Sequence, residues 1–257
     1  MEFFRIHKEE FVADVTFSRP PANALSSAVL KELSALLDEL EADDNVRVVL
    51  LHGEGRFFSA GADIKEFTSI ASSDEATALS QNGQQVLERI ERFPKPVIAA
   101  IHGAALGGGL ELAMSCHIRI VSENAKLGLP ELQLGIIPGF AGTQRLPRYV
   151  GFGKAAEMML TSEPITGAEA VQWGLANKAV PEEQLLEEAK KLAKKIAQKG
   201  PISVRATLQL LNSFKEKPFQ EAVREEAELF GSMFTTEDAK EGVQAFIEKR
   251  PPVFHGK

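Results

Sequence analysis

The feature that most constrains this chain is a long apolar stretch, Val97 to Cys116, that contains three consecutive glycines and one glutamate. Its hydropathy resembles that of a membrane helix, but Gly107–Gly109 and Glu111 lie inside it. A charge at mid-span is costly in lipid, and glycine is unfavourable within a helix. We therefore interpret the stretch as buried core, with a strand at 97–101, a glycine turn and a helix at 110–114.

The composition is that of an ordinary globular protein. At about 150 residues per domain, 257 residues make one large domain, or one domain with an appendage. Hydrophobic and charged fractions of 44% and 25% exclude a disordered, collagen-like or coiled-coil chain. The net charge of −7 argues against nucleic acid as a partner, because such binding needs a basic face.

Disulfide and metal chemistry find no support in the sequence. The single cysteine, Cys116, excludes an intrachain disulfide framework and a zinc site built from cysteines. The five histidines show no ligand spacing, so we expect no metal. We expect Cys116 to be buried, and His102 and His117 to lie in the core or at its edge.

The N-terminal residues do not resemble a targeting signal. The opening MEFFRIHKEEF has scattered charges and no apolar centre, and it is not the arginine-rich, acid-poor stretch of a transit peptide. We therefore expect no membrane association and a cytoplasmic location.

The first half of the chain alternates between strand and helix patterns. Short β-rich or apolar runs predict strands, and leucines at helical spacing after a Ser26 N-cap predict a helix. The predicted strands are 11–17, 46–51, 97–101 and 118–121, and further helices are predicted at about 74–92 and 110–114. This alternation indicates an α/β core.

After about residue 145 the pattern becomes mostly helical. Helices are predicted at about 153–160, 167–173, 182–198, 202–213, 218–233 and 236–248. No internal repeat or flexible linker is visible, so we expect an α/β core over 1–195 and a helical region over 196–257. Wide apolar faces on the last helices must pack on the core or on a neighbouring subunit.

Two glycine-containing turns could expose backbone N–H groups to a ligand. Residues 57–63 follow a buried strand, and the small Ala60, Gly61 and Ala62 leave the backbone uncovered. Residues 103–111 place glycines at a helix N-terminus, where free N–H groups can stabilise an oxyanion. The alternatives are a tight strand-to-helix turn and close helix–sheet packing.

Two glutamates lie in apolar surroundings. Glu111 lies among leucine, alanine and methionine, and Glu131 lies in a segment shaped by glycine and proline. Burial raises the pKa of a carboxylate towards values useful for proton transfer. Two carboxylates in different environments can share acid and base roles, although the sequence does not place them together. The alternative for Glu111 is an exposed helix face.

Several motifs, in order along the chain, resemble the enoyl-CoA hydratase/isomerase (crotonase) superfamily. The resemblance runs essentially end to end. It is carried by Phe58–Glu66, Pro94–Ala100, Ala105–Ala113, Pro138–Gly139, Gly142–Pro147 and Phe246–Pro252. It implies a spiral of ββα units with C-terminal helices that build a trimer or a dimer of trimers.

The resemblance also implies a site. The backbone N–H groups of Ala62 and Gly108 would form an oxyanion hole for the thioester carbonyl of an acyl-CoA substrate. Glu111 and Glu131 would hold one water between them. We assign Glu111 to activating this water for attack at Cβ, and Glu131 to exchanging the proton at Cα.

The implied reaction is the reversible syn addition of water to the 2,3 double bond of an enoyl-CoA thioester, in fatty-acid or branched-chain acyl-CoA degradation. No cofactor is implied, because coenzyme A is part of the substrate. The residues expected to contact substrate or CoA are Ala22, Ala24, Ala60, Ala62, Asp63, Ile64, Lys65 and Gly108.

Related activities remain open. A methylglutaconyl-CoA hydratase or a 3-enoyl-CoA isomerase would share the superfamily, but isomerases generally keep one of the two glutamates. Two departures from the superfamily pattern stand out. Phe140-Ala141 replaces a more glycine-rich pair, and the loop over 19–25 lacks a lysine that many members use for a CoA phosphate.

Three unrelated functions have weaker support in the sequence. A serine hydrolase would need glycine two residues before Ser59, where Phe57 stands. A dinucleotide site at 151–156 would need a preceding strand, which the sequence lacks. RNA binding occurs in some methylglutaconyl-CoA hydratases, but the lysines at 190–195 lie on an acid-studded helix.

Overall fold

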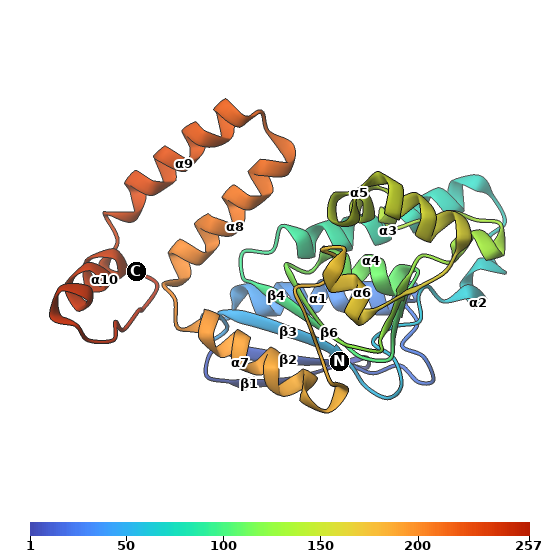
Figure 1. Cartoon of the computed structure of the whole chain (residues 1–257), viewed down its shortest axis with the longest axis horizontal. Coiled ribbons are helices and arrows are strands. Elements are labelled where there is room, and N and C mark those ends of the chain that lie inside the picture. The colour runs from blue at the N-terminus through green and yellow to red at the C-terminus, as the bar shows by residue number, and fades with distance from the viewer.

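In the computed structural model, which describes residues 1–257, a twisted sheet is covered by helices on both faces (Figure 1). The sheet has the strand order β1-β2-β3-β4-β6-β9, and all neighbours are parallel except β1 and β2. These strands are β1 (Phe4–Glu9), β2 (Val12–Phe17), β3 (Val48–Gly53), β4 (Val97–Ile101), β6 (Ile118–Ser122) and β9 (Lys178–Val180). A smaller sheet has the order β5 (Ala104–Leu106), β7 (Lys126–Gly128) and β8 (Ile165–Thr166).

The helices fill the connections between these strands. The α-helices of the core are α1 (Ser27–Ala42), α2 (Ile64–Phe67), α3 (Ser73–Glu91), α4 (Gly108–Ser115), α5 (Gly142–Thr161), α6 (Gly167–Gln172) and α7 (Leu185–Ala197). Two short 3₁₀ helices are η1 (Glu131–Leu134) and η2 (Glu182–Gln184). The chain ends with α8 (Pro201–Glu216), α9 (Phe219–Met233) and α10 (Glu237–Glu248).

Alternate residues on the central strands point to opposite faces of the sheet and belong to two different hydrophobic clusters. Val49 and Leu51 point into a cluster of 41 buried residues shared with α1, α3 and α4. Val48 and Leu50 point into a cluster of 11 buried residues on the other face, which α7 covers with leucine and alanines. Burial on both faces explains why these strands read as continuous apolar runs in the sequence.

The predicted α/β class is confirmed, and the main elements lie within a few residues of their predicted ranges. Ser26 caps α1 by accepting the N–H of Val29, and the leucines predicted to face inwards are buried. The strand β1 was missed because only Phe4 and Ile6 of its six residues are apolar, and it ends in a polar run over 7–9. Strands of two or three residues, such as β8 and β9, are too short to show a period.

One helix differs from the prediction. We expected a helix at about 153–160, but α5 begins at Gly142 and contains a kink at Gly151. Gly151 has φ 76° and ψ 162°, a non-helical conformation that glycine tolerates. The earlier start of α5 matters because its first residues approach the site.

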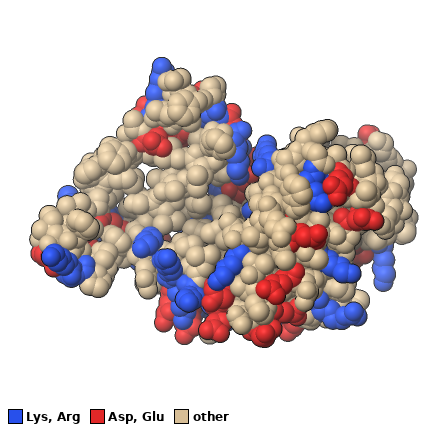
Figure 2. Space-filling view, in the orientation of Figure 1, with Lys and Arg blue, Asp and Glu red and all other residues tan.

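The C-terminal helices project from the core (Figure 1). No residue of α9 is buried, and the only buried residue of α8 is Ser213. Figure 2 shows that the surface over this region is largely uncharged in the same view. The predicted division at residue 195 falls near the end of α7 and stays a prediction. None of the helices combines the length and the hydropathy needed to span a bilayer.

Candidate active site

Residues 22–25 and residues 60–63, which are far apart in the sequence, lie side by side at one end of the central sheet. The N–H of Ala60 donates to Ala22 O at 2.9 Å, and the N–H of Leu25 donates to Gly61 O at 2.8 Å. The N–H of Asp63 then donates back to Leu25 O at 2.9 Å. The structure therefore brings the predicted contact residues of both segments together, including Ala24, which lies between these bonds.

Asn23 holds this arrangement and was missed by sequence reasoning. Its side chain accepts the N–H of Arg19 at 2.8 Å and donates to Glu54 O at 2.9 Å and Phe57 O at 2.8 Å. Asn23 is buried and has φ 52°, a left-handed conformation that asparagine adopts more readily than most residues. The sequence offered an asparagine two residues after a proline pair, which indicates a turn but not these bonds to residues 54 and 57.

The remaining predicted CoA contacts lie on the short helix α2. Asp63 caps this helix, and its carboxylate also pairs with the Arg19 guanidinium at 2.6 Å. The hydrogen bond from Arg19 lowers the pKa of Asp63 below its usual value. Ile64 and Lys65 are exposed. The Asp63 carboxylate is therefore committed to the protein, whereas Ile64 and Lys65 are accessible.

The backbone N–H groups of Ala62 and Gly108 face the same region. Neither group donates a hydrogen bond within the protein. Gly108 is the first residue of α4, and a Cβ added there would lie 3.3 Å from Ala62 N. Two uncommitted donors, one of them at a helix N-terminus, form an arrangement suited to a developing negative charge.

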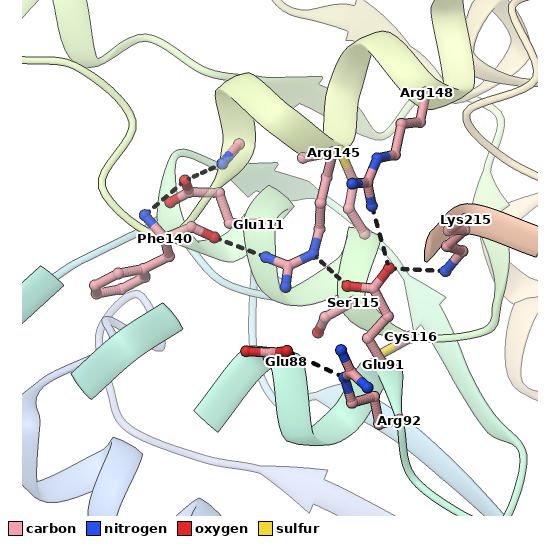
Figure 3. A network of polar contacts seen from close by, with 12 residues as sticks. Glu88, Glu91, Arg92, Glu111, Ser115, Cys116, Phe140, Arg145, Arg148 and Lys215 are labelled. Atoms are coloured by element: carbon pink, nitrogen blue, oxygen red, sulfur yellow. Dashed lines mark hydrogen bonds and ion pairs between the residues drawn. The ribbon is translucent and has the colours of Figure 1, made fainter. Parts of the chain in front are cut away.

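Glu111 lies one turn into α4 and is 1% exposed. Its Oε1 accepts the N–H groups of Phe140 at 2.8 Å and Gly142 at 2.7 Å (Figure 3). Its Oε2 accepts no hydrogen bond from the protein. Burial, followed by the nearby charge of Glu131, raises the pKa of Glu111 to about 7 against the opposing effect of the two amides. The carboxyl group of Glu111 therefore changes its protonation state near neutral pH.

Glu131 begins η1 and approaches the start of α4 from the other side. Its Oε1 lies where a side chain at position 107 would intrude, 3.0 Å from an added Cβ. Gly107 also has φ 50°, so glycine is required there on two grounds. The Oε2 of Glu131 is buried and accepts no hydrogen bond from the protein, and burial raises the pKa of this carboxyl.

The aromatic ring of Phe140 forms one wall beside Gly108. A Cβ added to Gly108 would lie 3.4 Å from the ring, and one added to Gly83 of α3 would lie 2.2 Å from it. The ring therefore fills the space that Gly83 leaves on α3. The following residue, Ala141, has φ 69°, a conformation that glycine would adopt without strain.

The competing sites have no geometric support. Ser59 is fully buried, and its hydroxyl donates to Asn23 O at 2.7 Å and accepts the N–H of Gly61 at 3.3 Å. Gly151 of the glycine pattern at 151–156 is a kink within α5, where no strand precedes it. No three His, Cys, Asp or Glu side chains are grouped to hold a metal ion.

Comparison with known proteins decides the family. Residues 7–257 match the enoyl-CoA hydratase/isomerase family. The chain belongs to this family. This membership agrees with the resemblance carried by the motifs over 58–147 and 246–252.

Among family relatives, a "probable enoyl-CoA hydratase" of Bacillus subtilis is 59% identical and covers 97% of both chains. A "short-chain-enoyl-CoA hydratase" of Clostridium acetobutylicum is 46% identical over 95% of this chain and 94% of the relative. The crystal structure of an enoyl-CoA hydratase from Bacillus anthracis superposes with a TM-score of 0.94 at 39% identity, covering 99% of this chain and 100% of that one. These similarities confirm the predicted fold and support a hydro-lyase activity of the enoyl-CoA hydratase type.

The raised pKa of Glu111 predicts a pH-dependent effect of its replacement on stability. Because the folded-state pKa is raised, the stability associated with neutral Glu111 is fully present below pH 4.5 and is lost as pH rises through about 7. Glu111→Gln mimics the neutral form, so its advantage in unfolding free energy over the wild type should grow by about 2–3 kcal/mol between pH 5 and pH 8. Urea unfolding at one protein concentration measures this, and an advantage independent of pH would contradict it.

Proposed function

We propose that this chain hydrates 2-enoyl-CoA thioesters through two glutamates and a backbone oxyanion hole. The observation that carries the proposal is the placement of two carboxylates, the buried Glu111 and the half-buried Glu131, beside the uncommitted amides of Ala62 and Gly108. Attack of water at Cβ requires a base, a proton donor for Cα and a partner for the thioester oxygen. This site offers a group for each of these roles.

The oxyanion amides act on charge that develops during the reaction. Addition at Cβ of the conjugated thioester moves electron density onto the carbonyl oxygen. The N–H groups of Ala62 and Gly108 would donate to that oxygen, and the dipole of α4 adds to the effect at Gly108. Because these donors are fixed by the backbone, they need no rearrangement when the charge appears.

The two carboxylates divide the proton transfers. Ionised Glu111 takes a proton from water as the water oxygen bonds to Cβ, and protonated Glu131 delivers a proton to Cα. Fixing Oε1 of Glu111 by two amides leaves its Oε2 to face the water. Since the charge of Glu131 opposes ionisation of Glu111, the two carboxyl groups lose their protons in separate steps, and the state with one proton precedes the doubly ionised one as pH rises.

The presence of two glutamates, rather than one, favours hydration over isomerisation. Moving a double bond from the 3 to the 2 position transfers a proton between Cα and Cγ, which one carboxylate can do alone. Adding water requires that the water be both positioned and deprotonated while Cα gains a proton. The retention of both Glu111 and Glu131 in one site therefore supports hydratase activity as the main reaction.

We further infer that CoA lies along the paired segments 22–25 and 60–65. Ala22, Ala24 and Ala60 have small side chains that allow close approach, and Lys65 offers an accessible positive charge. No lysine stands at 19–25, and Arg19 is paired with Asp63 instead. The phosphate contact that many family members make from that loop is therefore assigned here to Lys65.

The exposed face of the C-terminal region supports assembly with further copies of this chain. Phe214 of α8 is 82% exposed, Phe219 of α9 is 76% exposed and Phe246 of α10 is 86% exposed. A monomer rarely leaves so many large apolar side chains in water, and helices with almost no buried residues gain little from their own packing. We propose a trimer or a dimer of trimers in which these faces are covered.

The glutamate mechanism predicts large losses of turnover. Glu111→Gln and Glu131→Gln should each lower kcat for crotonyl-CoA by at least about a hundredfold, because each removes an acid–base group. The loss of conjugated-thioester absorbance measures hydration, and isomerisation of a 3-enoyl-CoA is measured beside it. Glu157→Gln, whose side chain is 62% exposed on α5, is the matched control and should keep wild-type kcat. Near-normal turnover in either site variant would rule out the mechanism.

The oxyanion hole can be tested with two substitutions at one position. Gly108→Ala and Gly108→Pro both add a Cβ, but only proline removes the N–H. Proline is tolerated at the first position of a helix, where Gly108 stands. We expect kcat of Gly108→Pro to fall about 100–1,000-fold below that of Gly108→Ala, as for other losses of one oxyanion donor. Equal kcat values in the two folded variants would show that the N–H of Gly108 does not stabilise the oxyanion.

The proposed assembly predicts a solution mass of three or six times 28.0 kDa by light scattering. Phe246→Asp should shift the mass towards 28.0 kDa at low protein concentration, because it places a charge in the covered face. Phe246→Leu keeps an apolar side chain and should preserve the assembly. A wild-type mass of 28.0 kDa at micromolar concentration would be incompatible with the proposal.

A further inference from the structure

An arginine buried beside Glu111 has no part in the proton transfers described above. Arg145 lies in the first turn of α5 and is 5% exposed. Its Nη1 donates to Phe140 O at 2.7 Å, and its Nε donates to Glu91 Oε2 at 3.0 Å. A buried guanidinium is costly unless its donors are used, so this placement requires an explanation.

Phe140 O belongs to the turn that binds Glu111. The N–H groups of Phe140 and Gly142 both donate to Glu111 Oε1 (Figure 3). Two amides so close in sequence can reach one oxygen because Ala141 between them is left-handed. A left-handed alanine is disfavoured in isolation, so contacts outside it must hold the turn. The Arg145 side chain supplies one such contact, from Nη1 to Phe140 O, and the backbone N–H of residue 145 supplies another, to Ala141 O at 2.9 Å.

Glu91, at the end of α3, fixes the guanidinium in turn. Its other oxygen, Oε1, accepts Lys215 Nζ of α8 at 2.7 Å, and its backbone carbonyl accepts Asn212 Nδ2 at 3.0 Å. Burial alone would raise the pKa of Glu91, but the bond from Lys215 and the charges of Arg145 and Lys215 hold it below the usual value. Ionised Glu91 therefore anchors Arg145 and ties α8 to the same network.

We propose that Arg145 is a positioning residue for Glu111, holding the Phe140–Gly142 turn in the conformation that directs two amides onto one carboxylate oxygen. The inference rests on the proposed hydratase function and extends it to a residue that does not touch the substrate. Arg145 acts on Glu111 both through the turn and through its positive charge, which opposes the effect of burial. Other charged or titratable groups around the network are Glu131, Glu91, Lys215, Arg148 and His117, whose pKa burial lowers to about 4.

The test compares three substitutions on α5. Arg145→Met removes the guanidinium donors and the charge. Arg145→Lys keeps the charge but not the planar guanidinium that donates to two partners at once. Arg148→Met is the matched control. Arg148 approaches the same Glu91 at 3.9 Å but is 53% exposed and does not touch the turn. The readouts are the pH profile of kcat for crotonyl-CoA, the KM, and circular dichroism of each variant.

We expect Arg145→Met to lower kcat at least about tenfold with a KM within about threefold of wild type, the pattern of a lost transition-state interaction. The acid limb of its kcat–pH profile should move up by about 0.5–1 pH unit, because loss of the positive charge of Arg145 favours the neutral form of Glu111. Arg145→Lys should recover the position of the acid limb but only part of kcat, and Arg148→Met should match the wild type in both.

A double-substitution cycle separates positioning from general damage to the fold. If Arg145 acts through Glu111, then Arg145→Lys should lower kcat much less in the Glu111→Gln background than in wild type. Equal effects in both backgrounds, or an unmoved acid limb in Arg145→Met, would overturn the inference. If Arg145→Met does not fold, Arg145→Lys and its cycle decide the question.

Failure of the inference is distinguishable from failure of the proposed function. Absence of crotonyl-CoA hydration in the wild-type protein removes the proposed function and the inference with it. Hydration that Glu111→Gln abolishes, combined with an Arg145→Met profile identical to the wild type, removes the inference alone.

Discussion

The burial of one carboxylate is the constraint on which the rest of the site depends. Glu111 lies in a helix whose other residues are apolar or small, and all eight residues of α4 are buried. An ionised group there is tolerated only if it is hydrogen-bonded, and its neutral form is otherwise preferred. The amides of Phe140 and Gly142 satisfy one oxygen and leave the other without a protein partner. This balance is what keeps the pKa near 7 rather than far above or below it.

Backbone conformations with positive φ at three positions set the geometry of the site. Asn23, Gly107 and Ala141 all have φ between 50° and 69°, and each lies next to a functional group. Gly107 has no side chain that would collide with Glu131, and Asn23 fixes the loop beside residues 60–63. Ala141 lets the amides on either side of it donate to Glu111. Glycine needs no support in this conformation. Asparagine and alanine do, and the structure supplies it by the side-chain bonds of Asn23 and by the contacts of Arg145.

The sequence was sufficient for the fold class and for the main elements because these depend on local patterns. Buried strands such as β3 and β4 are continuous apolar runs, and Ser26 is a capping residue that acts within three positions. The edge strand β1 was missed because few of its residues are apolar, although it pairs with the neighbouring β2 in a hairpin. The strands of two or three residues were missed because they are too short to show a period. Glu111 and Glu131 could be proposed from burial and from the resemblance. Asn23 and Arg145 could not, because their roles consist of contacts with segments up to 54 residues away.

The net charge of −7 has less bearing on an anionic ligand than the local arrangement of charge. Carboxylates close to the uncommitted amides are paired or inclined to hold a proton. Asp63 pairs with Arg19, and Glu66 accepts the N–H and the hydroxyl of Ser27. Burial raises the pKa of both Glu111 and Glu131. Under the proposed function, the field at the thioester oxygen would be set mainly by two N–H groups and a helix N-terminus.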